Sequence, residues 1–188
     1  MKIIAFTGMP FSGKTEAVKI ARNMSIEIIR MGDLVWEEVK KRGLKISDKN
    51  VGFIANEMRN KFGKDIWAVK TIEKIKDKND VKSLLIDGVR NFEEVVRFKK
   101  ILGDNFILIA INSSDHVRHK RALNRGREDD SRVIREIKER DIREIKWGIK
   151  EAIKSSDVIV SNNGTKKDLE NKIIEIFNDL LKNDKLIN

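Results

Sequence analysis

The chain has 188 residues, a length that suits a single α/β domain with a sizeable buried core. It contains no cysteine, which excludes disulfides, thiolate metal sites and thiol nucleophiles. The net charge of +10 favours polyanionic partners, either nucleic acids or phosphorylated small molecules. No apolar run approaches the roughly 20 residues of a membrane span, and Met1–Phe6 is too short for a signal peptide. We therefore expect a cytoplasmic protein without a membrane partner.

The first part of the chain predicts two strands followed by a series of helices. Lys2–Thr7 is a short apolar run with β-branched residues, which indicates a buried strand, and Ile26–Met31 indicates a second one. Between them, Lys14–Asn23 carries small and apolar residues at helical spacing. Segment 33–78 then predicts three helices. Their N-cap candidates are Asp33, Ser47 or Asp48, and Asp65.

The rest of the sequence continues the alternation of strands and helices. Ser83–Ile86 and the strongly hydrophobic Asn105–Ile111 predict strands, and Phe92–Leu102 predicts the helix between them. A helical, Arg-rich stretch covers residues 115–154, with an interruption near Gly126. The last elements are a short strand, Asp157–Val160, and a closing helix that begins with a capping box of Thr165 and Asp168.

Several of these strands lack polar alternation, as expected when helices cover both faces of a parallel sheet. The predicted fold class is therefore α/β, with three layers and a five-stranded parallel sheet flanked by helices. We expect one domain over residues 1–188, with a core made of residues 1–32, 79–114 and 155–188. The helical stretches 33–78 and 115–154 are longer than a crossover requires, and we expect them to be insertions that carry mobile parts.

The segment after the first strand matches the phosphate-binding pattern G-x-x-x-x-G-K-[ST], and it opens a predicted helix as that pattern requires. Its glycines allow successive backbone N–H groups to point toward phosphate oxygens beside the positive end of the helix dipole. We expect Lys14 to bridge the β- and γ-phosphates of ATP, and the Thr15 hydroxyl to bind Mg²⁺. The predicted ATP-binding residues of this loop are Gly8, Met9, Pro10, Phe11, Ser12, Gly13, Lys14 and Thr15.

A carboxylate and an arginine follow the third predicted strand. Asp87 comes directly after that strand, and in a P-loop fold such a carboxylate can hold Mg²⁺, often through water. The alternative is a turn that starts a helix, where Asp and Gly are common. Arg90 lies at the same end of the sheet, where it could hold a phosphate.

Eight arginines fall between positions 118 and 143, among several carboxylates. Such a segment is either a solvated, salt-bridged surface or a site for phosphates. Arg121 and Arg125 share a helix face because they are four residues apart. We predict nucleotide or phosphate contacts for Arg121, Arg125, Arg127 and Arg140, and surface positions for the other arginines, including Arg118.

Taken in order, these motifs resemble the adenylate kinase superfamily of P-loop NTPases over nearly the whole chain. The G-x-P-G-x-G-K loop of that family agrees with this sequence except at Phe11, which replaces a glycine. Met31–Trp36 resembles the T-G-D-L/M-L-R segment of the family's monophosphate-binding part, and Trp36 replaces its arginine. The resemblance implies a helical acceptor-binding insertion whose contact residues are Asp33, Trp36, Arg59 and Arg90.

The second insertion resembles the lid of adenylate kinases that have short lids. The run from Arg121 to Asp130, followed by Arg140, is similar to the family's R-x-x-x-R-G…R-x-D-D…R pattern. By that resemblance Arg121 would pack on the ATP base, and three further arginines would neutralise phosphates. With the loop lysine, the implied catalytic residues are Lys14, Arg125, Arg127 and Arg140.

The segment after the last strand also resembles dephospho-CoA kinase. This likeness implies backbone contacts of Asn163 and Gly164 near adenine, whereas a purely structural loop with an N-cap is the alternative. Overall the chain is most similar to an archaeal group of adenylate-kinase-related P-loop proteins. That group shares the G-M-P-x-S-G-K start and the D-G-V-R segment.

These observations predict a kinase that uses ATP and Mg²⁺ to phosphorylate a phosphorylated, nucleotide-type small molecule, such as a nucleoside monophosphate or dephospho-CoA. Phe11 and Trp36 argue against efficient transfer to AMP. A phosphate acceptor needs no general base, whereas a hydroxyl acceptor needs one, for which Asp33 is the candidate. The alternatives are a regulatory ATPase that acts on RNA or ribosomes and a protein that only binds nucleotide. The location of the surplus Lys and Arg residues should distinguish them.

Overall fold

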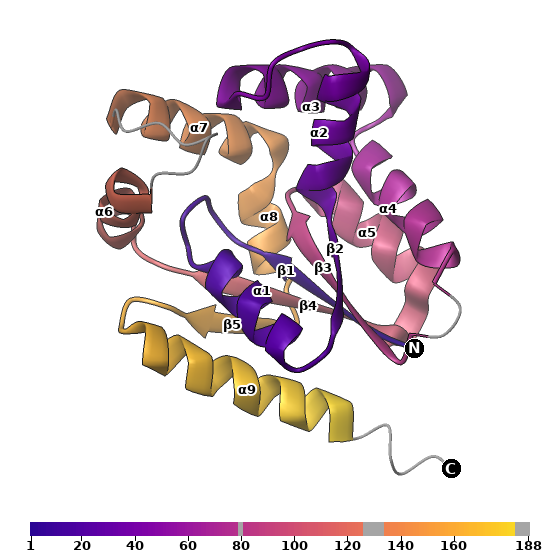
Figure 1. Cartoon of the computed structure of the whole chain (residues 1–188), viewed down its shortest axis with the longest axis vertical. Helices are drawn as coiled ribbons and strands as arrows, with labels where there is room; N and C mark the ends of the chain where they lie inside the picture. Colours follow the sequence, from indigo (N-terminus) through magenta and orange to yellow (C-terminus); the bar gives the residue numbers. More distant parts are fainter. Residues whose placement is uncertain (79–80, 126–133, 183–188) are drawn as a thin grey trace.

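The computed structural model describes residues 1–78, 81–125 and 134–182, and its centre is a five-stranded parallel sheet (Figure 1). The strands are β1 (Lys2–Thr7), β2 (Glu27–Arg30), β3 (Ser83–Val89), β4 (Phe106–Asn112) and β5 (Val158–Ser161). Their order is β2-β3-β1-β4-β5, and all neighbouring strands are parallel. The predicted α/β class is therefore confirmed. Because β1 is the middle strand, the loop after it lies at the centre of the sheet's carboxyl edge.

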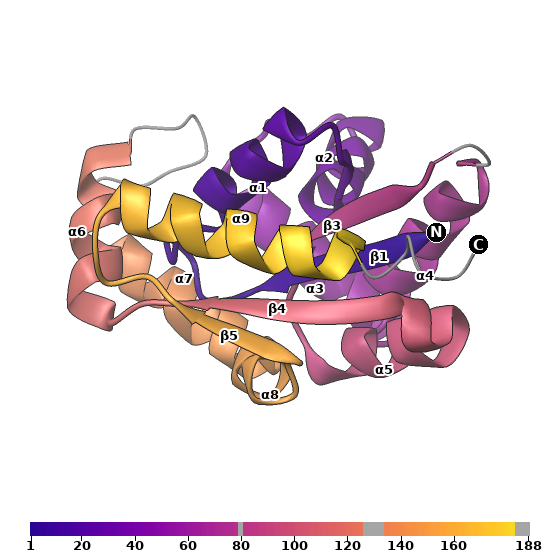
Figure 2. The ribbon, with the colours of Figure 1, turned by 90° about the horizontal axis from the view of Figure 1, so that it is seen from below.

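The two faces of β1 pack into two different cores, because successive side chains of a strand point to opposite faces. Ile4 and Phe6 pack with α1 (Lys14–Asn23) and α9 (Lys166–Lys182), which lie next to each other on one side of the sheet (Figures 1 and 2). Ile3 and Ala5 belong to the other core, which includes residues of the first insertion and of α5 (Phe92–Leu102). The structure thus has the predicted three layers.

Three helices follow β2: α2 (Met31–Lys41), α3 (Asp48–Phe62) and α4 (Ile66–Lys76). Ser47 caps α3, since its hydroxyl accepts a backbone hydrogen bond of 3.2 Å from the first turn. The cap predicted at Asp33 is wrong, because α2 begins two residues earlier and Asp33 lies inside its first turn. Asp65 precedes α4 but makes no side-chain cap; it accepts a 2.7 Å hydrogen bond from Arg97 instead.

The second insertion contains α6 (Asp115–Arg125) and α7 (Ile134–Trp147), and α8 (Ile149–Lys154) follows directly. The interruption predicted near Gly126 lies outside the described residues. A further break, which the sequence analysis did not predict, occurs at Gly148. Its φ of 100° is a backbone conformation that favours glycine, and it redirects the chain between α7 and α8.

A 3₁₀ turn, Gly103–Asn105, connects α5 to β4.

The closing helix begins as predicted. The capping box before α9 is present, since the Thr165 amide and hydroxyl each donate a 2.8 Å hydrogen bond to Asp168. Among the described residues, no helix has the length and apolar character needed to cross a membrane.

Candidate active site

A cavity of about 1050 Å³ lies at the carboxyl edge of the sheet. Its walls come from the loop after β1, from α1, α2, α6 and α7, and from the loop after β5. In parallel α/β folds ligands bind at this edge. The cavity collects many of the predicted site residues, which are Pro10, Phe11, Gly13, Lys14, Thr15, Trp36, Asp87, Arg90, Arg121, Arg140, Asn163 and Gly164.

The phosphate loop, residues 8–15, is held in its curled form by close packing around two glycines. Gly8 and Gly13 have φ values of 141° and 110°. A Cβ atom at Gly8 would collide with the carbonyl oxygen of Ile111, and one at Gly13 would collide with the amide of Asn162. Any other residue at these positions would therefore displace the loop from the end of the sheet.

Lys14 reaches back over this loop. Its Nζ donates hydrogen bonds to the carbonyl oxygens of Gly8, at 2.5 Å, and Met9, at 3.0 Å. Burial, together with the neighbouring Arg90, lowers the pKa of Lys14 to about 8. Burial makes the charged ammonium group less stable, and a bound anion would stabilise it. A phosphate-binding lysine needs this property.

Phe11 lines the cavity, but most of its side chain is buried. Its φ is 63°, and its side chain is buried in a small apolar cluster with Ala122 of α6 and Ile137 of α7. The Arg140 guanidinium lies 5.5 Å from the centre of the Phe11 ring. Phe11 therefore connects the phosphate loop to the two helices of the second insertion.

Glu144 is a site residue that the sequence analysis missed. It is 1% exposed, forms an ion pair with Arg90, and has an oxygen 3.6 Å from Nε of Arg140. Burial alone would raise its pKa, but Arg90, Arg140 and Lys14 together lower the pKa of Glu144 below its ordinary value. The only sequence signal was its position four residues after Arg140 on a helix, which places both side chains on one face.

Asp87 and Thr15 both line the cavity, as expected for residues that hold Mg²⁺ with ATP. Oδ1 of Asp87 is buried and has no hydrogen-bond partner among the described residues. A hard carboxylate oxygen without a partner fits a Mg²⁺ ion, either directly or through water. No group of three or more His, Asp or Glu residues gathers there in the described part of the chain, so phosphates and water would have to supply the remaining ligands.

Of the predicted acceptor-binding residues, two line the cavity and two do not. Trp36 and Arg90 line the cavity, and Arg30 lies above the Trp36 ring at 5.7 Å. Arg59 does not reach the cavity: it is 6% exposed and donates a 3.0 Å hydrogen bond to the fully buried Glu94. Asp33 lies outside the cavity wall, where it forms a 3.2 Å ion pair with Arg30.

Arg121 approaches the phosphate loop from α6. It donates to the Ser113 hydroxyl at 3.1 Å and to the Asn162 side chain at 3.4 Å. Asn162, a second residue that was missed, is buried and donates a 2.8 Å hydrogen bond to the Ser12 carbonyl. The predicted contact residue Asn163 accepts a 2.8 Å hydrogen bond from the Ser114 amide, so its side chain also has a structural role.

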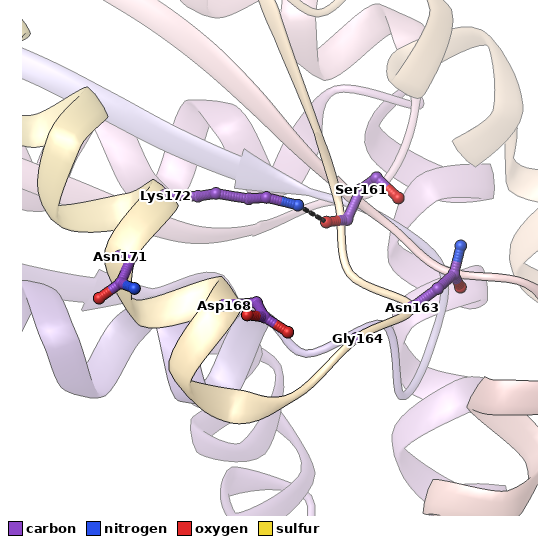
Figure 3. Close-up of a pocket in the computed structure, with 6 residues that line it drawn as sticks. All are labelled: Ser161, Asn163, Gly164, Asp168, Asn171 and Lys172. Atoms are coloured by element: carbon purple, nitrogen blue, oxygen red, sulfur yellow. Dashed lines mark hydrogen bonds between the residues drawn. The ribbon is translucent and has the colours of Figure 1, made fainter.

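A smaller pocket adjoins this loop and shares Asn163 and Gly164 with the cavity (Figure 3). Lys172 of α9 closes one side by donating a 3.0 Å hydrogen bond to the Ser161 carbonyl. The remaining lining residues, Asp168 and Asn171, come from the first turns of the same helix. The pocket therefore continues the surface of the loop after β5, where the sequence predicts adenine contacts.

Arg118 was predicted to be a surface residue, and that prediction is wrong. It is 1% exposed and donates to the Pro10 carbonyl at 3.0 Å and to both carboxylate oxygens of Asp141 at 2.9 and 2.8 Å. Asp115 accepts a further hydrogen bond of 2.5 Å from it. Arg118 therefore ties the phosphate loop to α6 and α7. The side chains of Arg125 and Arg127 lie outside the described residues.

The cavity lining is strongly basic. Eight of its described side chains are basic and only two are acidic, an excess of six positive charges. The basic ones are Lys14, Lys19, Arg30, Arg90, Lys120, Arg121, Arg140 and Lys166, and the acidic ones are Glu16 and Asp87. A cavity with this charge favours a compact polyanion such as a nucleoside triphosphate.

Sequence comparisons identify relatives of the whole chain. Residues 7–138 match the family described as "AAA domain". A "UPF0200/UPF0201 protein" of Archaeoglobus fulgidus is 45% identical over 184 residues, which cover 97% of this chain but 57% of that protein. A "UPF0200 protein" of Methanosarcina barkeri is 42% identical and is covered over 97% of both chains.

Comparison with solved structures shows the same fold in several kinases. A dephospho-CoA kinase from Campylobacter jejuni has a TM-score of 0.62 at 17% identity and covers 98% of this chain and 100% of its own. A shikimate kinase from Aquifex aeolicus has a TM-score of 0.51 at 18% identity, with 99% of both chains covered. At these identities the likeness concerns the fold alone.

Proposed function

The chain belongs to the UPF0200 family of archaeal proteins and, through its AAA-domain match, to the kinase-like P-loop proteins, and we propose that it is an ATP-dependent kinase of a nucleotide-type small molecule. The observation that carries the proposal is the basic cavity built around the phosphate loop, with Lys14 at its centre. A kinase of this type needs positioning and charge neutralisation rather than a covalent intermediate.

We assign the phosphates of ATP to the loop and to the start of α1. Lys14 would exchange the carbonyl oxygens of Gly8 and Met9 for β- and γ-phosphate oxygens, which is favourable because its ammonium group is otherwise poorly solvated. Arg140, held above Phe11, would stabilise the charge that develops during transfer. Bound Mg²⁺, with Thr15 and Asp87 as its protein ligands, would supply further neutralisation of phosphate charge.

The base of ATP belongs to the other end of the cavity. His116, Val117 and Asn124 of α6 line this end together with Asn163 and Gly164 of the loop after β5. The mixture of apolar and amide groups suits a heteroaromatic ring with polar edges. Arg121 lies between this end and the phosphate loop, so it would contact ATP where the base and the phosphates meet.

The position of the charge favours this proposal over an RNA-linked regulatory ATPase. An RNA-binding face would spread its Lys and Arg residues over a continuous outer surface. Here a large part of the surplus lines one cavity, whose lining carries six excess positive charges. The ring of Trp147 packs against the Arg59 guanidinium, which lies 4.3 Å from its centre, so this ring face is already covered.

The proposal is tested by following the label of γ-labelled ATP into a panel of nucleosides, nucleotides and dephospho-CoA in the presence of Mg²⁺. We expect one acceptor to be labelled, and we expect Lys14→Ala to reduce the rate at least about 100-fold, since it removes a charge from the transferring phosphate. Lys100→Ala changes an exposed lysine of α5 and should leave the rate unchanged. Labelling that persists in Lys14→Ala, or that never reaches any acceptor, would contradict the proposal.

A further inference from the structure

The arginines on the α2, α3 and α7 side of the cavity are all paired with carboxylates. Arg30 lies 3.2 Å from Asp33 and 3.9 Å from Asp87. Arg59, which the resemblance assigned to an acceptor phosphate, is buried against Glu94. Both arginines are therefore neutralised by the protein itself before any acceptor arrives.

The same holds for the arginines of α7 and for Arg90. Glu144 forms an ion pair with Arg90 and lies 3.6 Å from Arg140. Arg143 donates two hydrogen bonds, of 2.9 and 2.8 Å, to the carboxylate of Asp48, which also lies 3.5 Å from Arg140. The guanidinium of Arg143 is fixed in place, because it packs where a side chain on Gly52 would otherwise lie.

The two halves of the site therefore differ in charge. On this acceptor side, five arginines face five carboxylates, and these are Arg30, Arg59, Arg90, Arg140 and Arg143 against Asp33, Asp48, Asp87, Glu94 and Glu144. Among the residues that line the cavity on the nucleotide side, five are basic and one is acidic, and these are Lys14, Lys19, Lys120, Arg121 and Lys166 with Glu16.

A phosphate monoester carries nearly two negative charges, so burying it requires cations that are not already neutralised. Glu144 raises the energy of an acceptor phosphate further, because a phosphate held by Arg90 would come close to a buried carboxylate. One Glu144 oxygen, Oε2, is buried without a hydrogen-bond partner among the described residues, so it offers an acceptor to an incoming donor group such as O–H.

We propose, on the premise that the chain is the kinase described above, that the group which receives the phosphoryl is an uncharged hydroxyl rather than a phosphate. The hydroxyl oxygen forms a bond to the γ-phosphorus of ATP, and the bond from that phosphorus to the oxygen bridging to the β-phosphate breaks. ADP leaves with the bond's electron pair. The hydroxyl proton leaves to solvent, because Asp33, the base predicted from the sequence, lies outside the cavity wall and is paired with Arg30.

The products of transfer distinguish the possible acceptors. Wild-type protein is given γ-labelled ATP and Mg²⁺ with matched pairs, namely adenosine and AMP, and each other nucleoside with its monophosphate. A labelled phosphate monoester, which resists acid, is the expected product. A labelled phosphoanhydride such as ADP made from AMP would overturn this inference while leaving the kinase proposal intact. Lys14-independent labelling, or hydrolysis alone, would remove its premise.

Binding gives a second readout that does not need activity. With the nucleotide side filled by a non-hydrolysable ATP analogue, wild-type protein should bind AMP no more tightly than adenosine in calorimetry. Glu144→Gln keeps the shape of the side chain but removes the charge that neutralises Arg90 and Arg140. We expect it to bind AMP about tenfold more tightly than wild type, with adenosine unchanged.

Asp48→Asn serves as a second variant in case Glu144→Gln fails to fold, since Asp48 is 30% exposed and pairs with Arg140 and Arg143 at the edge of the same cluster. It should shift the preference toward AMP in the same direction. Tight AMP binding to the wild type, or no gain of AMP affinity in a variant that is folded by circular dichroism, would contradict the inference.

Discussion

Lys14 shows how one side chain connects the structure of the phosphate loop to its proposed use. Its ammonium group is bound to the carbonyl oxygens of Gly8 and Met9, and its pKa is lowered to about 8, chiefly by burial. An unfolded chain would bind the proton with the ordinary pKa of 10.5, so this group destabilises the nucleotide-free protein at neutral pH. Its stability contribution becomes more favourable as the pH rises from 8 to 10.5.

We predict that ATP binding is coupled to proton uptake above pH 8. Bound phosphates favour the charged lysine, so its pKa rises on binding. From a starting pKa of about 8, uptake should be about 0.1 proton per ATP at pH 7 and about 0.9 at pH 9. Calorimetry in buffers of different ionisation enthalpy measures this number. The Lys14→Arg variant should show no uptake, and an equal uptake in both proteins would assign the proton to another group.

For individual residues, the sequence predicts a role in the site when the neighbouring residues on which that role depends are close along the chain. The phosphate loop is identified from eight consecutive residues, and Lys14, Thr15 and Gly13 of this loop all line the cavity. Glu144 and Asn162 were missed because their partners are distant in sequence, at Arg90 and Ser12. Their roles depend on packing between elements, which no local pattern contains.

Among the helices and strands, the most informative contact is the docking of the second insertion onto the phosphate loop. Arg118 of α6 binds the loop carbonyl of Pro10 and the carboxylate of Asp141 on α7. Burial would lower the pKa of Arg118, but Asp141 and Asp115 raise it above the ordinary value, so the charge is retained. Asp141 lies next to Arg140 in the chain, so the same contact positions a proposed catalytic arginine.

We predict that Asp141→Asn both destabilises the fold and weakens nucleotide binding. The change removes one of the two carboxylates that pair with the buried Arg118, which costs on the order of 2 kcal/mol, and it loosens the attachment of α7 to the phosphate loop. Urea unfolding and calorimetry with ATP and Mg²⁺ measure the two effects. Asp179→Asn, an exposed change on α9, is the matched control. A variant with unchanged unfolding midpoint and ATP affinity would show that this contact does not hold α7 in place.

Element boundaries were predicted well where a local signal marks them and poorly where tertiary packing decides. Ser47 and the Thr165–Asp168 box cap their helices as predicted, because capping depends on adjacent residues. The extension of β3 to Val89 differs from prediction, since pairing with β1 continues the strand. The start of α2 at Met31 also differs from prediction. Gly148 was not recognised as a break because the helical pattern continues on both sides of it.

On the scale of the whole molecule, the sequence predicted five parallel strands but not their order. The alternation of apolar runs with helices is enough for the fold class, whereas the order β2-β3-β1-β4-β5 depends on contacts between residues far apart in the chain. The distribution of charged residues over the fold could not be predicted from the sequence either. Composition provided the total of +10, and only the fold shows that the cavity lining holds an excess of six positive charges and that carboxylates outside the lining pair with the arginines of its acceptor side.

The central claim is that this charged cavity transfers a phosphoryl group to a small molecule, and the fate of the γ-phosphate tests it most directly. Purified protein is incubated with γ-labelled ATP, Mg²⁺ and a small acceptor, with and without structured RNA, and labelled ester and labelled inorganic phosphate are measured together. We predict that the label appears mainly in the ester, depends on Lys14 and does not respond to RNA. Release of the label as inorganic phosphate, accelerated by RNA and with no labelled ester, would contradict the account.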